Sequence, residues 1–387
     1  MQIIEVNKPA LAKKFLQVNT LLHKGDPNYI QPLNKDINEV FDPAKNKAFR
    51  HGYAIRWILL DHKNNLIGRI AAFVNDKYKT KGDTMKYGGC GFFDSINNQE
   101  AANILLNTAK NWLQNNGCQG MDGPINFGER DSWWGLLIEG FMPPLYKMNY
   151  NAPYYKNLFE NFGFKVFFNQ LCYGRLLKPV LAHKFYTNHA KVAALGGYTV
   201  RNINKNQLDA YASDFTTIYN LAWSGHGGLK QMNLAVVKKM FKTMKPIMDE
   251  NLILFAYHNN SPVAFFINIP DLNFYFKRFN GKFGLLQKLQ FLFMQKNNTN
   301  PKCVGLVFGV IPQHQGKGVD SFLIKEASDL FRTPAIKYTQ YEMQWIGDFN
   351  PKIINVCHQL DSVLTRKLAT YRYHFNTNIA VERHPIL

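Results

Sequence analysis

The chain has 387 residues, 46% of them hydrophobic, and a formal net charge of +19. Such a chain is globular and long enough for two domains, and no apolar run approaches the roughly 20 residues of a membrane-spanning helix. The positive charge favours an anionic partner, which could be CoA phosphates, an acidic acceptor, a membrane surface or nucleic acid.

The sequence predicts no metal or redox site, no secretory signal and no nucleic-acid-binding motif. The five cysteines are scattered without a C-x-x-C pair, so we expect no metal site and no redox pair, and reduced cytoplasmic thiols. The segment Met1–Val18 mixes acids and bases and lacks the apolar core of a secretory signal. There is no RNA-binding motif, zinc finger or basic recognition helix, so nucleic acid is not an expected partner.

The first half of the chain alternates strands and helices in an order that the second half repeats. Periodicity predicts, in order, a strand at Ile3–Val6, a helix near Ala10–Leu22, a hairpin of Tyr53–Leu60 and Leu66–Val74, a strand at Tyr87–Phe93 and a helix at Gln99–Asn116. The turn before the last helix, D-S-I-N-N, contains no glycine and offers few free backbone amides.

A long ordered loop is predicted at Gly123–Tyr155, which is rich in Gly, Pro, Asn and aromatic residues. Its polar residues Glu129, Arg130 and Asp131, with Trp133 and Trp134, could line a polar pocket. They could equally form an aromatic-packed connection in which Arg130 pairs with an acid.

The boundary between the halves is expected between Lys178 and Lys191, which gives domains of residues 1–180 and 181–387. The second half predicts a strand at Tyr198–Ile203, helices at Leu208–Trp223 and Asn233–Met248, and a hairpin of Leu252–Tyr257 and Pro262–Ile269. His226, in a glycine-rich turn, could reach an acceptor amine or be an ordinary loop residue.

A basic amphipathic segment follows at Phe274–Lys296. Its leucines and phenylalanines alternate with Lys277, Arg278, Lys282, Lys288 and Lys296. It could rest on an anionic membrane or cover an acyl chain. Alternatively, it is a helix packed on the sheet whose lysines extend to solvent.

A strand, a glycine turn and a helix come next. The strand Val304–Val310 ends before Pro312, Gln315-Gly316-Lys317-Gly318 forms the turn, and apolar residues from Phe322 to Phe331 recur at helical spacing. A glycine turn at a helix start presents free N–H groups that suit a pyrophosphate. The spacing fits neither a Walker loop nor a dinucleotide fingerprint.

The words V-I-P-Q-H-Q-G-K-G resemble the acyl-CoA loop, Q/R-x-x-G-x-G/A, of the GNAT acetyltransferases. A register starting at Gln313 satisfies the pattern literally; one starting at Gln315 keeps the family's distance from the strand and places Asp320 at the last position. We prefer the second. The resemblance implies that acetyl-CoA or another acyl-CoA is bound by Phe308, Gly309, Val310, Gln315, Gly316, Lys317, Gly318, Val319 and Asp320.

Two more passages extend this resemblance. E-M-Q-W-I-G-D-F-N-P resembles the W-I-x-x-x-N entry to the fourth GNAT helix, which would make Asn350 a CoA ligand; Asn350-Pro351 is also a plain helix start. Asn157–Phe164 resembles the end of that helix in the first half. The implied fold is α/β (α+β): two tandem GNAT-like domains, each a mixed, mostly antiparallel sheet flanked by helices, with Leu364–Tyr373 as the last strand and the first copy lacking the CoA loop.

The resemblance implies direct acyl transfer from CoA to an amine, which needs a base and a proton donor. Candidates for the base are Glu342, Asp271 and His358; Cys357 occupies the position of the usual proton-donating tyrosine. Three hypotheses stay open: a cytoplasmic N-acyltransferase, a non-catalytic CoA-binding or sensing protein, and a membrane-associated acyltransferase acting on a lipid amine. The sequence does not name the acceptor or the oligomeric state.

Overall fold

The computed structural model of the chain describes residues 1–223, 231–297 and 299–386, and His226 lies outside them. The first half contains the strands β1 (Gln2–Glu5), β2 (Gly52–Leu60), β3 (Leu66–Asn75), β4 (Tyr87–Ser95), β5 (Gly120–Gly123) and β6 (Leu136–Glu139). Its helices are α1 (Pro9–Leu22), α2 (Asn34–Val40), the short η1 (Lys47–Arg50), α3 (Gln99–Asn115) and α4 (Tyr155–Phe162). The predicted helix at Gln99–Asn116 is confirmed.

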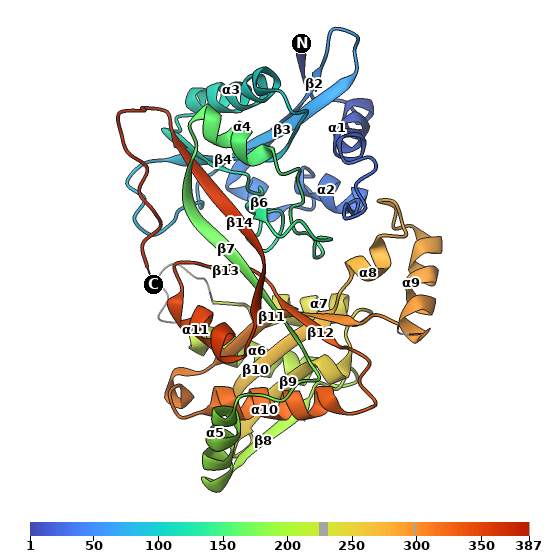
Figure 1. Cartoon of the computed structure of the whole chain (residues 1–387), viewed down its shortest axis with the longest axis vertical. Helices are drawn as coiled ribbons and strands as arrows, with labels where there is room; N and C mark the ends of the chain where they lie inside the picture. Colours follow the sequence, from blue (N-terminus) through green and yellow to red (C-terminus); the bar gives the residue numbers. More distant parts are fainter. Residues whose placement is uncertain (224–230, 298, 387) are drawn as a thin grey trace.

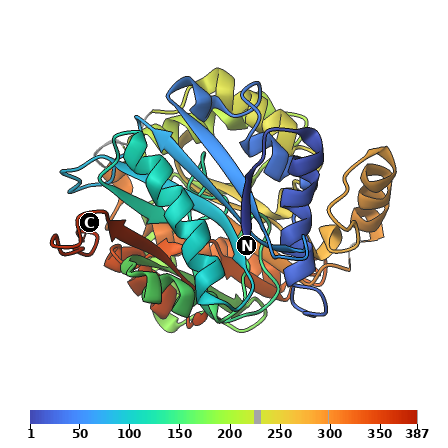
Figure 2. The same cartoon turned by 90° about the horizontal axis from the view of Figure 1, so that it is seen from above.

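Alternate residues of β3 enter two different cores, as the two-residue period of a strand requires. Ile70 and Ala72 pack against α3 and α4, whereas Ala71 and Phe73 pack with α1 and α2. Helices therefore cover both faces of the sheet in this half (Figure 2).

The second half repeats the alternation of strands and helices seen in the first half. Its strands are β8 (Tyr198–Asn202), β9 (Ile253–His258), β10 (Ser261–Pro270), β11 (Lys302–Val310), β12 (Gln340–Met343) and β13 (Ile346–Gly347). Its helices are α5 (His183–Ala194), α6 (Leu208–Trp223), α7 (Leu234–Met244), η2 (Glu250–Leu252), α8 (Asn273–Phe276), α9 (Leu285–Asn297), η3 (Pro312–His314), α10 (Val319–Arg332) and α11 (Pro351–Gln359). The hairpin β9–β10, the strand β11 and the helix α10 lie where the sequence predicts them.

Two long strands, β7 (Lys165–Leu176) and β14 (Val363–His374), join the halves into one sheet (Figure 1). They pair with each other in antiparallel fashion, and the end of β14 also pairs with β5, while the end of β7 pairs with β12. The order is β1-β2-β3-β4-β5-β14-β7-β12-β11-β10-β9-β8, with β6 on β14 and β13 on β7. The last strand of the chain thus completes the sheet of the first half, so the expected division at residues 180 and 181 does not separate the sheet into two.

The predicted mixed, mostly antiparallel architecture is confirmed. In the part of the chain that the structure describes, β4–β5 and β11–β12 are the two parallel pairs, one in each half. Each pair is connected by a helix, α3 or α10, as a parallel connection requires.

The basic segment does not pack on the sheet as one of its two interpretations expects. It forms α8 and α9, which stand out from the body of the molecule (Figures 1 and 2). On α9 only Phe291 is buried; the leucines are exposed.

Candidate functional site

The connection from β11 to α10 leaves several backbone N–H groups free. Gly316 and Gly318 both have positive φ angles, +71° and +86°, which glycine adopts without strain. No side chain caps the start of α10, and no partner among the described residues accepts from the N–H groups of Val319 or Asp320. The predicted loop is therefore an uncapped helix start, which suits an anion.

The other loop residues have definite places. The Gln315 side chain donates to the Val310 carbonyl at 2.8 Å, which folds the turn onto the end of the strand. Lys317 is exposed, and Asp320 lies in the first turn of α10. The negative charge of Asp320 favours the helix start but would repel a phosphate beside it.

The strands β11 and β12 separate next to this loop. Their pairing runs from Lys302 opposite Gln340 to Gly305 opposite Met343 and stops there, while β11 continues to Val310. Gly305 is required because a Cβ at this position would overlap the Tyr341 hydroxyl. Beyond Gly305, no strand of the described residues pairs with the edge of β11 that faces away from β10.

An apolar cavity of about 120 Å³ occupies the gap between β11 and β12. The strands contribute Phe266, Phe308, Tyr341 and Met343, α10 contributes Ile324, Ala327 and Phe331, and α11 contributes Ile353, Val356 and Cys357. Of the predicted ligands, Phe308 lines it, whereas Gly309 and Val310 pair with β10 through Phe265 and Ala264. The apolar lining suits a hydrocarbon chain.

The start of α11 adjoins this cavity. Asn350 caps the helix, because its Oδ1 accepts from the Ile353 N–H at 3.4 Å, as its helix-start interpretation predicts. Cys357 is buried in the cavity wall, and burial raises the pKa of its thiol to about 12. The neighbouring His358 is exposed, and its Nε2 lies 3.4 Å from the hydroxyl of Tyr173 on β7.

Glu342 lies in a buried ion cluster on the other face of β12. Its oxygens accept from Arg366 at 2.7 and 3.1 Å, from Lys302 at 2.9 Å and from Thr365 at 2.9 Å. Burial alone would raise the pKa of this carboxyl, but Arg366 and Lys302 outweigh it and hold the pKa below its usual value. This environment makes Glu342 a weak base whose geometry is that of a structural ion pair, so we no longer favour it as the general base.

The pKa of Asp271 is shifted in the opposite direction to that of Glu342. It follows β10, its Oδ1 accepts from the Asn273 N–H at 3.0 Å, and Lys302 and Glu342 are among the charges that influence it. Burial dominates and raises its pKa to about 6. Asp271 and Glu342 thus share one neighbourhood, whereas His358 contacts Tyr173 instead. Perturbed carboxyls of this kind are typical of functional sites.

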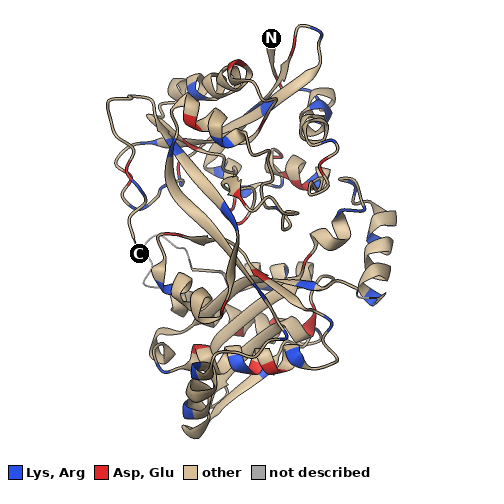
Figure 3. Ribbon diagram, in the orientation of Figure 1, with Lys and Arg blue, Asp and Glu red and all other residues tan. Residues whose placement is uncertain are grey.

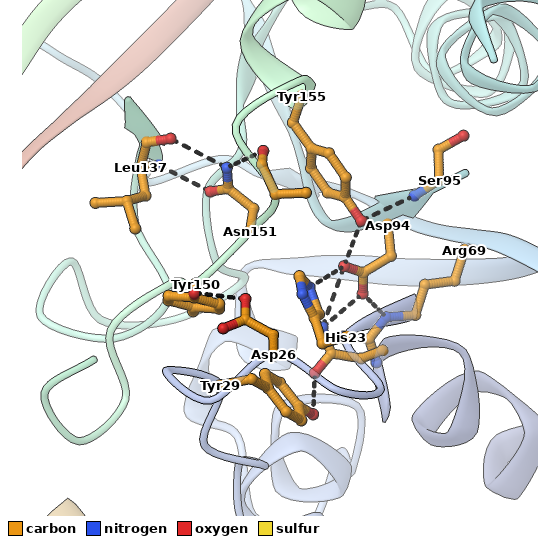
Figure 4. A network of polar contacts seen from close by, with 12 residues as sticks. His23, Asp26, Tyr29, Arg69, Asp94, Ser95, Leu137, Tyr150, Asn151 and Tyr155 are labelled. Atoms are coloured by element: carbon orange, nitrogen blue, oxygen red, sulfur yellow. Dashed lines mark hydrogen bonds and ion pairs between the residues drawn. The ribbon is translucent and has the colours of Figure 1, made fainter. Parts of the chain in front are cut away.

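A second polar cluster, in the first half, gave no signal in the sequence (Figure 4). Asp94, at the end of β4, is 2% exposed and accepts from Arg69 at 2.6 Å, from Asn19 at 3.0 Å and from the Tyr155 hydroxyl at 3.1 Å. His23 Nε2 lies 3.7 Å from it. Burial would raise the pKa of Asp94, but Arg69 and His23 hold it below its usual value. These residues are far apart in sequence, so no local motif predicts that they form a cluster.

This cluster borders a small cavity of about 50 Å³ between the halves, also lined by Trp133, Tyr150 and Asn273. The Tyr150 hydroxyl donates to Asp26 at 2.6 Å, and the ring of Tyr29 stacks on His23 at 4.9 Å (Figure 4). The aromatic-packed interpretation of the long loop holds in part, because Trp133 and Trp134 are buried and Arg130 lies over Trp134 at 5.7 Å. Of the residues expected to line a polar pocket, Trp133 alone lines this cavity. Glu129, Arg130 and Asp131 themselves are exposed.

The parallel pair of the first half has no corresponding gap. Ile125 follows β5 and donates its N–H to the Cys90 carbonyl of β4 at 2.7 Å, and a Cβ at Gly91 would overlap the Ile125 backbone. The start of α3 is capped, because Asn98 Oδ1 accepts from the Ala101 N–H at 2.8 Å. The connection itself occupies the space that is open between β11 and β12.

Comparison with known proteins places the fold. No protein-family model matches the sequence. The chain is 22% identical over 370 residues to a bacterial ceramide synthase of Caulobacter vibrioides, covering 93% of this chain and 94% of the relative. It is 24% identical over 371 residues to protein YghO of Escherichia coli, covering 93% and 92%.

The solved structure of a tandem GNAT protein from the clavulanic acid biosynthesis pathway superposes with a TM-score of 0.54 at 10% identity, over 96% of this chain and 98% of that one. The likeness covers both halves in their order along the chain. It agrees with the two parallel strand pairs, each connected by its helix. The chain therefore has a tandem GNAT-like fold.

Proposed function

We propose that this chain is an acyl-CoA-dependent N-acyltransferase and that its acceptor is a long-chain lipid amine. The observation that carries the proposal is the apolar gap between β11 and β12, whose wall includes the middle and last turns of α10, together with the uncapped start of the same helix. In a tandem GNAT-like fold this combination fits a CoA thioester. The free N–H groups would bind the diphosphate, the open edge of β11 would accommodate the pantetheine arm, and the cavity would receive the acyl end.

Within this proposal, Asp271 is assigned as the base. The amine must lose a proton as its nitrogen attacks the thioester carbonyl, forming the C–N bond while the C–S bond breaks. A carboxyl whose pKa is raised to about 6 is ionised near neutral pH and still a stronger base than an ordinary aspartate. Its neighbour Lys302 would help to keep the incoming amine neutral by charge repulsion.

Tyr173 is the favoured donor of the proton that the CoA thiolate takes up. It lies on β7 next to α11, is 5% exposed, and Cys357 influences its hydroxyl. Burial raises the pKa of both the Tyr173 hydroxyl and the Cys357 thiol, so acidity does not separate them. Tyr173 is preferred because its hydroxyl lies 3.4 Å from Nε2 of the exposed His358, through which it can regain a proton from solvent.

Two observations favour a lipid acceptor and an acyl group longer than acetyl. The cavity wall is apolar apart from Arg175 and Ser328, which gives a hydrocarbon chain more to contact than an acetyl group. The Caulobacter relative is named as a ceramide synthase, a name that points to the amine of a long-chain amino alcohol.

Release of free CoA thiol tests the proposal. Acyl-CoAs of increasing chain length are offered with a long-chain amino alcohol in detergent or with a short soluble amine. We expect the fastest release with the long-chain pair. Activity confined to acetyl-CoA and a soluble amine would contradict the lipid acceptor.

A second function, CoA binding without catalysis, is favoured by Asp320 beside the expected diphosphate and by Cys357 in place of the usual tyrosine. It predicts a rise in melting temperature with CoA and acyl-CoA, because a ligand of the folded state stabilises it, but no thiol release with any amine.

A further inference from the structure

The helix α9 exposes an apolar stripe. Five side chains on one side are 51–77% exposed: Leu285, Leu286, Leu289, Leu292 and Phe293. The opposite side fastens the helix, since Phe291 is 3% exposed and its ring lies 5.2 Å from Tyr275 and 5.7 Å from Phe276. The helix is thus apolar on two sides, one against the protein and one facing outward.

Cations surround this stripe and acids are absent from it. Residues 272–300 contain Lys277, Arg278, Lys282, Lys288 and Lys296 and no Asp or Glu. Figure 3 shows Lys and Arg but no acidic residue along α8 and α9. None of the five forms an ion pair with a residue that the structure describes. A leucine stripe with lysines beside it is typical of a helix that lies in the interface of an anionic bilayer.

A bilayer could take up α9 along its surface but not across its thickness. With 13 residues it is shorter than a bilayer-spanning helix, and in the described ranges no helix combines the length and apolarity to cross one. A second copy of the chain is a poor occupant of this face, because pairing two such surfaces would bring ten cations together.

A groove beside the same helix is lined by residues that flank the candidate base in the sequence. The groove has a volume of about 440 Å³, and its lining includes Leu292 and Lys296 on α9, the acids Asp249 and Glu250, and Pro270 and Tyr275 on either side of Asp271 along the chain. α8 begins at Asn273, whose side chain donates to the Pro144 carbonyl at 2.7 Å and lines the cavity between the halves.

We propose that the exposed face of α9 docks this enzyme on an anionic lipid bilayer, so that a lipid amine can pass from the membrane to Asp271. The delivery of the amine rests on the proposed function; the docking itself does not.

Flotation with vesicles tests the docking. The full chain is mixed with phosphatidylcholine vesicles, with or without phosphatidylglycerol, and we expect it to float only with the anionic ones and to detach at high salt. Leu286→Ser with Leu289→Ser should reduce the bound fraction roughly tenfold, and Lys282→Gln, Lys288→Gln and Lys296→Gln together by a similar factor.

Matched substitutions elsewhere control for general hydrophobicity and charge. Leu195→Ser changes a leucine that is 68% exposed on another surface, and Lys8→Gln, Lys13→Gln and Lys14→Gln remove three exposed cations from the first half. Neither set should change flotation. If they reduce it as much as the α9 variants do, or if the intact chain floats with no vesicle, the docking proposal is overturned.

Two further readouts separate the possible failures. If the α9 variants convert a dimer into a monomer in sedimentation, the stripe is an interface between copies and the proposal is wrong. Melting-temperature shifts with acyl-CoA should be the same in the α9 variants as in the intact chain, and thiol release should fall only with a vesicle-embedded amine. An intact chain that binds no anionic vesicle but turns over a detergent-dispersed amine would refute docking alone; an intact chain that floats with anionic vesicles but releases no thiol would refute the acyltransferase alone.

Discussion

The two halves use one architecture, and they differ where a ligand would bind. In the first half, the backbone of Ile125 fills the gap beyond the parallel pair β4–β5, and Asn98 caps α3. In the second half, the gap beyond β11–β12 is open, and α10 starts at Gly318 without a cap. A few connecting residues therefore decide whether this fold has room for a thioester or is closed by its own chain.

The buried carboxyls of the halves differ in the same way. Asp94 has a hydrogen-bonding partner for each oxygen and a lowered pKa, which is the condition of a residue that stabilises the fold. Asp271 is held in an environment that disfavours its charge, which costs stability and makes it a better base. These environments fit a structural role for Asp94 and the catalytic role proposed for Asp271.

The strongest test removes Asp94. Asp94→Ala leaves the guanidinium of Arg69 buried without its carboxylate, so the free energy of unfolding should fall by about 3–5 kcal/mol. Urea denaturation measures it. Glu139→Gln, at an exposed ion pair with Lys367, should change it by less than about 1 kcal/mol. An Asp94→Ala chain of unchanged stability that no longer releases thiol would move the catalytic centre to the first half.

Asp271→Asn should abolish most activity and stabilise the protein. Loss of the base lowers kcat by about 100-fold or more. Because the folded-state pKa is raised, the folded chain binds more protons than the unfolded chain between pH 4 and pH 6, and stability is lost as pH rises through this window. The uncharged asparagine avoids that loss, so above pH 7 the variant should be more stable by roughly 3 kcal/mol.

Two measurements check this variant. The kcat/KM of the intact chain should rise with pH towards a plateau above about pH 7, because the base must be ionised. Urea denaturation of both proteins at pH 4 and pH 8 should give a stability difference only at the higher pH. Equal activity of Asp271→Asn and the intact chain would exclude this base.

Filling the gap tests the open pair directly. Ala327→Phe places a ring in the cavity between β11 and β12, where Ala327 is 1% exposed, and should weaken acyl-CoA binding at least tenfold with little change in stability. Isothermal titration and thermal melting measure the two effects. Ala109→Phe on α3 enters a filled core instead, so it should destabilise by about 1–3 kcal/mol and leave binding unchanged. If the two variants change acyl-CoA binding and stability to the same extent, the gap beyond β11–β12 is no more open than the one beyond β4–β5.

The sequence predicted what depends on neighbours along the chain. The strand β11, its glycine turn and α10 follow from residues 302–332, and the missing glycine before α3 already indicated few free backbone amides there. The sequence alone could not predict contacts between residues that are far apart in the chain. Nothing local reveals that β14 would lie on β5, that Arg366 would neutralise Glu342, or that Asp94 would meet His23 and Arg69. The leucines of α9 have helical periodicity, but periodicity does not say which apolar side faces the protein.

The smallest effect concerns the anion loop and decides between its two registers. If the pattern starts at Gln315, Asp320 stands at the glycine position, close to the diphosphate, and Asp320→Asn should bind CoA several-fold more tightly, most clearly at low salt. The helix loses a favourable charge in its first turn, so stability should fall by about 0.5 kcal/mol. Asp329→Asn, at the other end of α10, should leave the affinity unchanged. If the pattern starts at Gln313, Asp320 lies beyond it and its substitution should alter stability alone. Titration of both variants at two salt concentrations therefore identifies which amides form the anion site, and a weaker affinity of Asp320→Asn would contradict both registers.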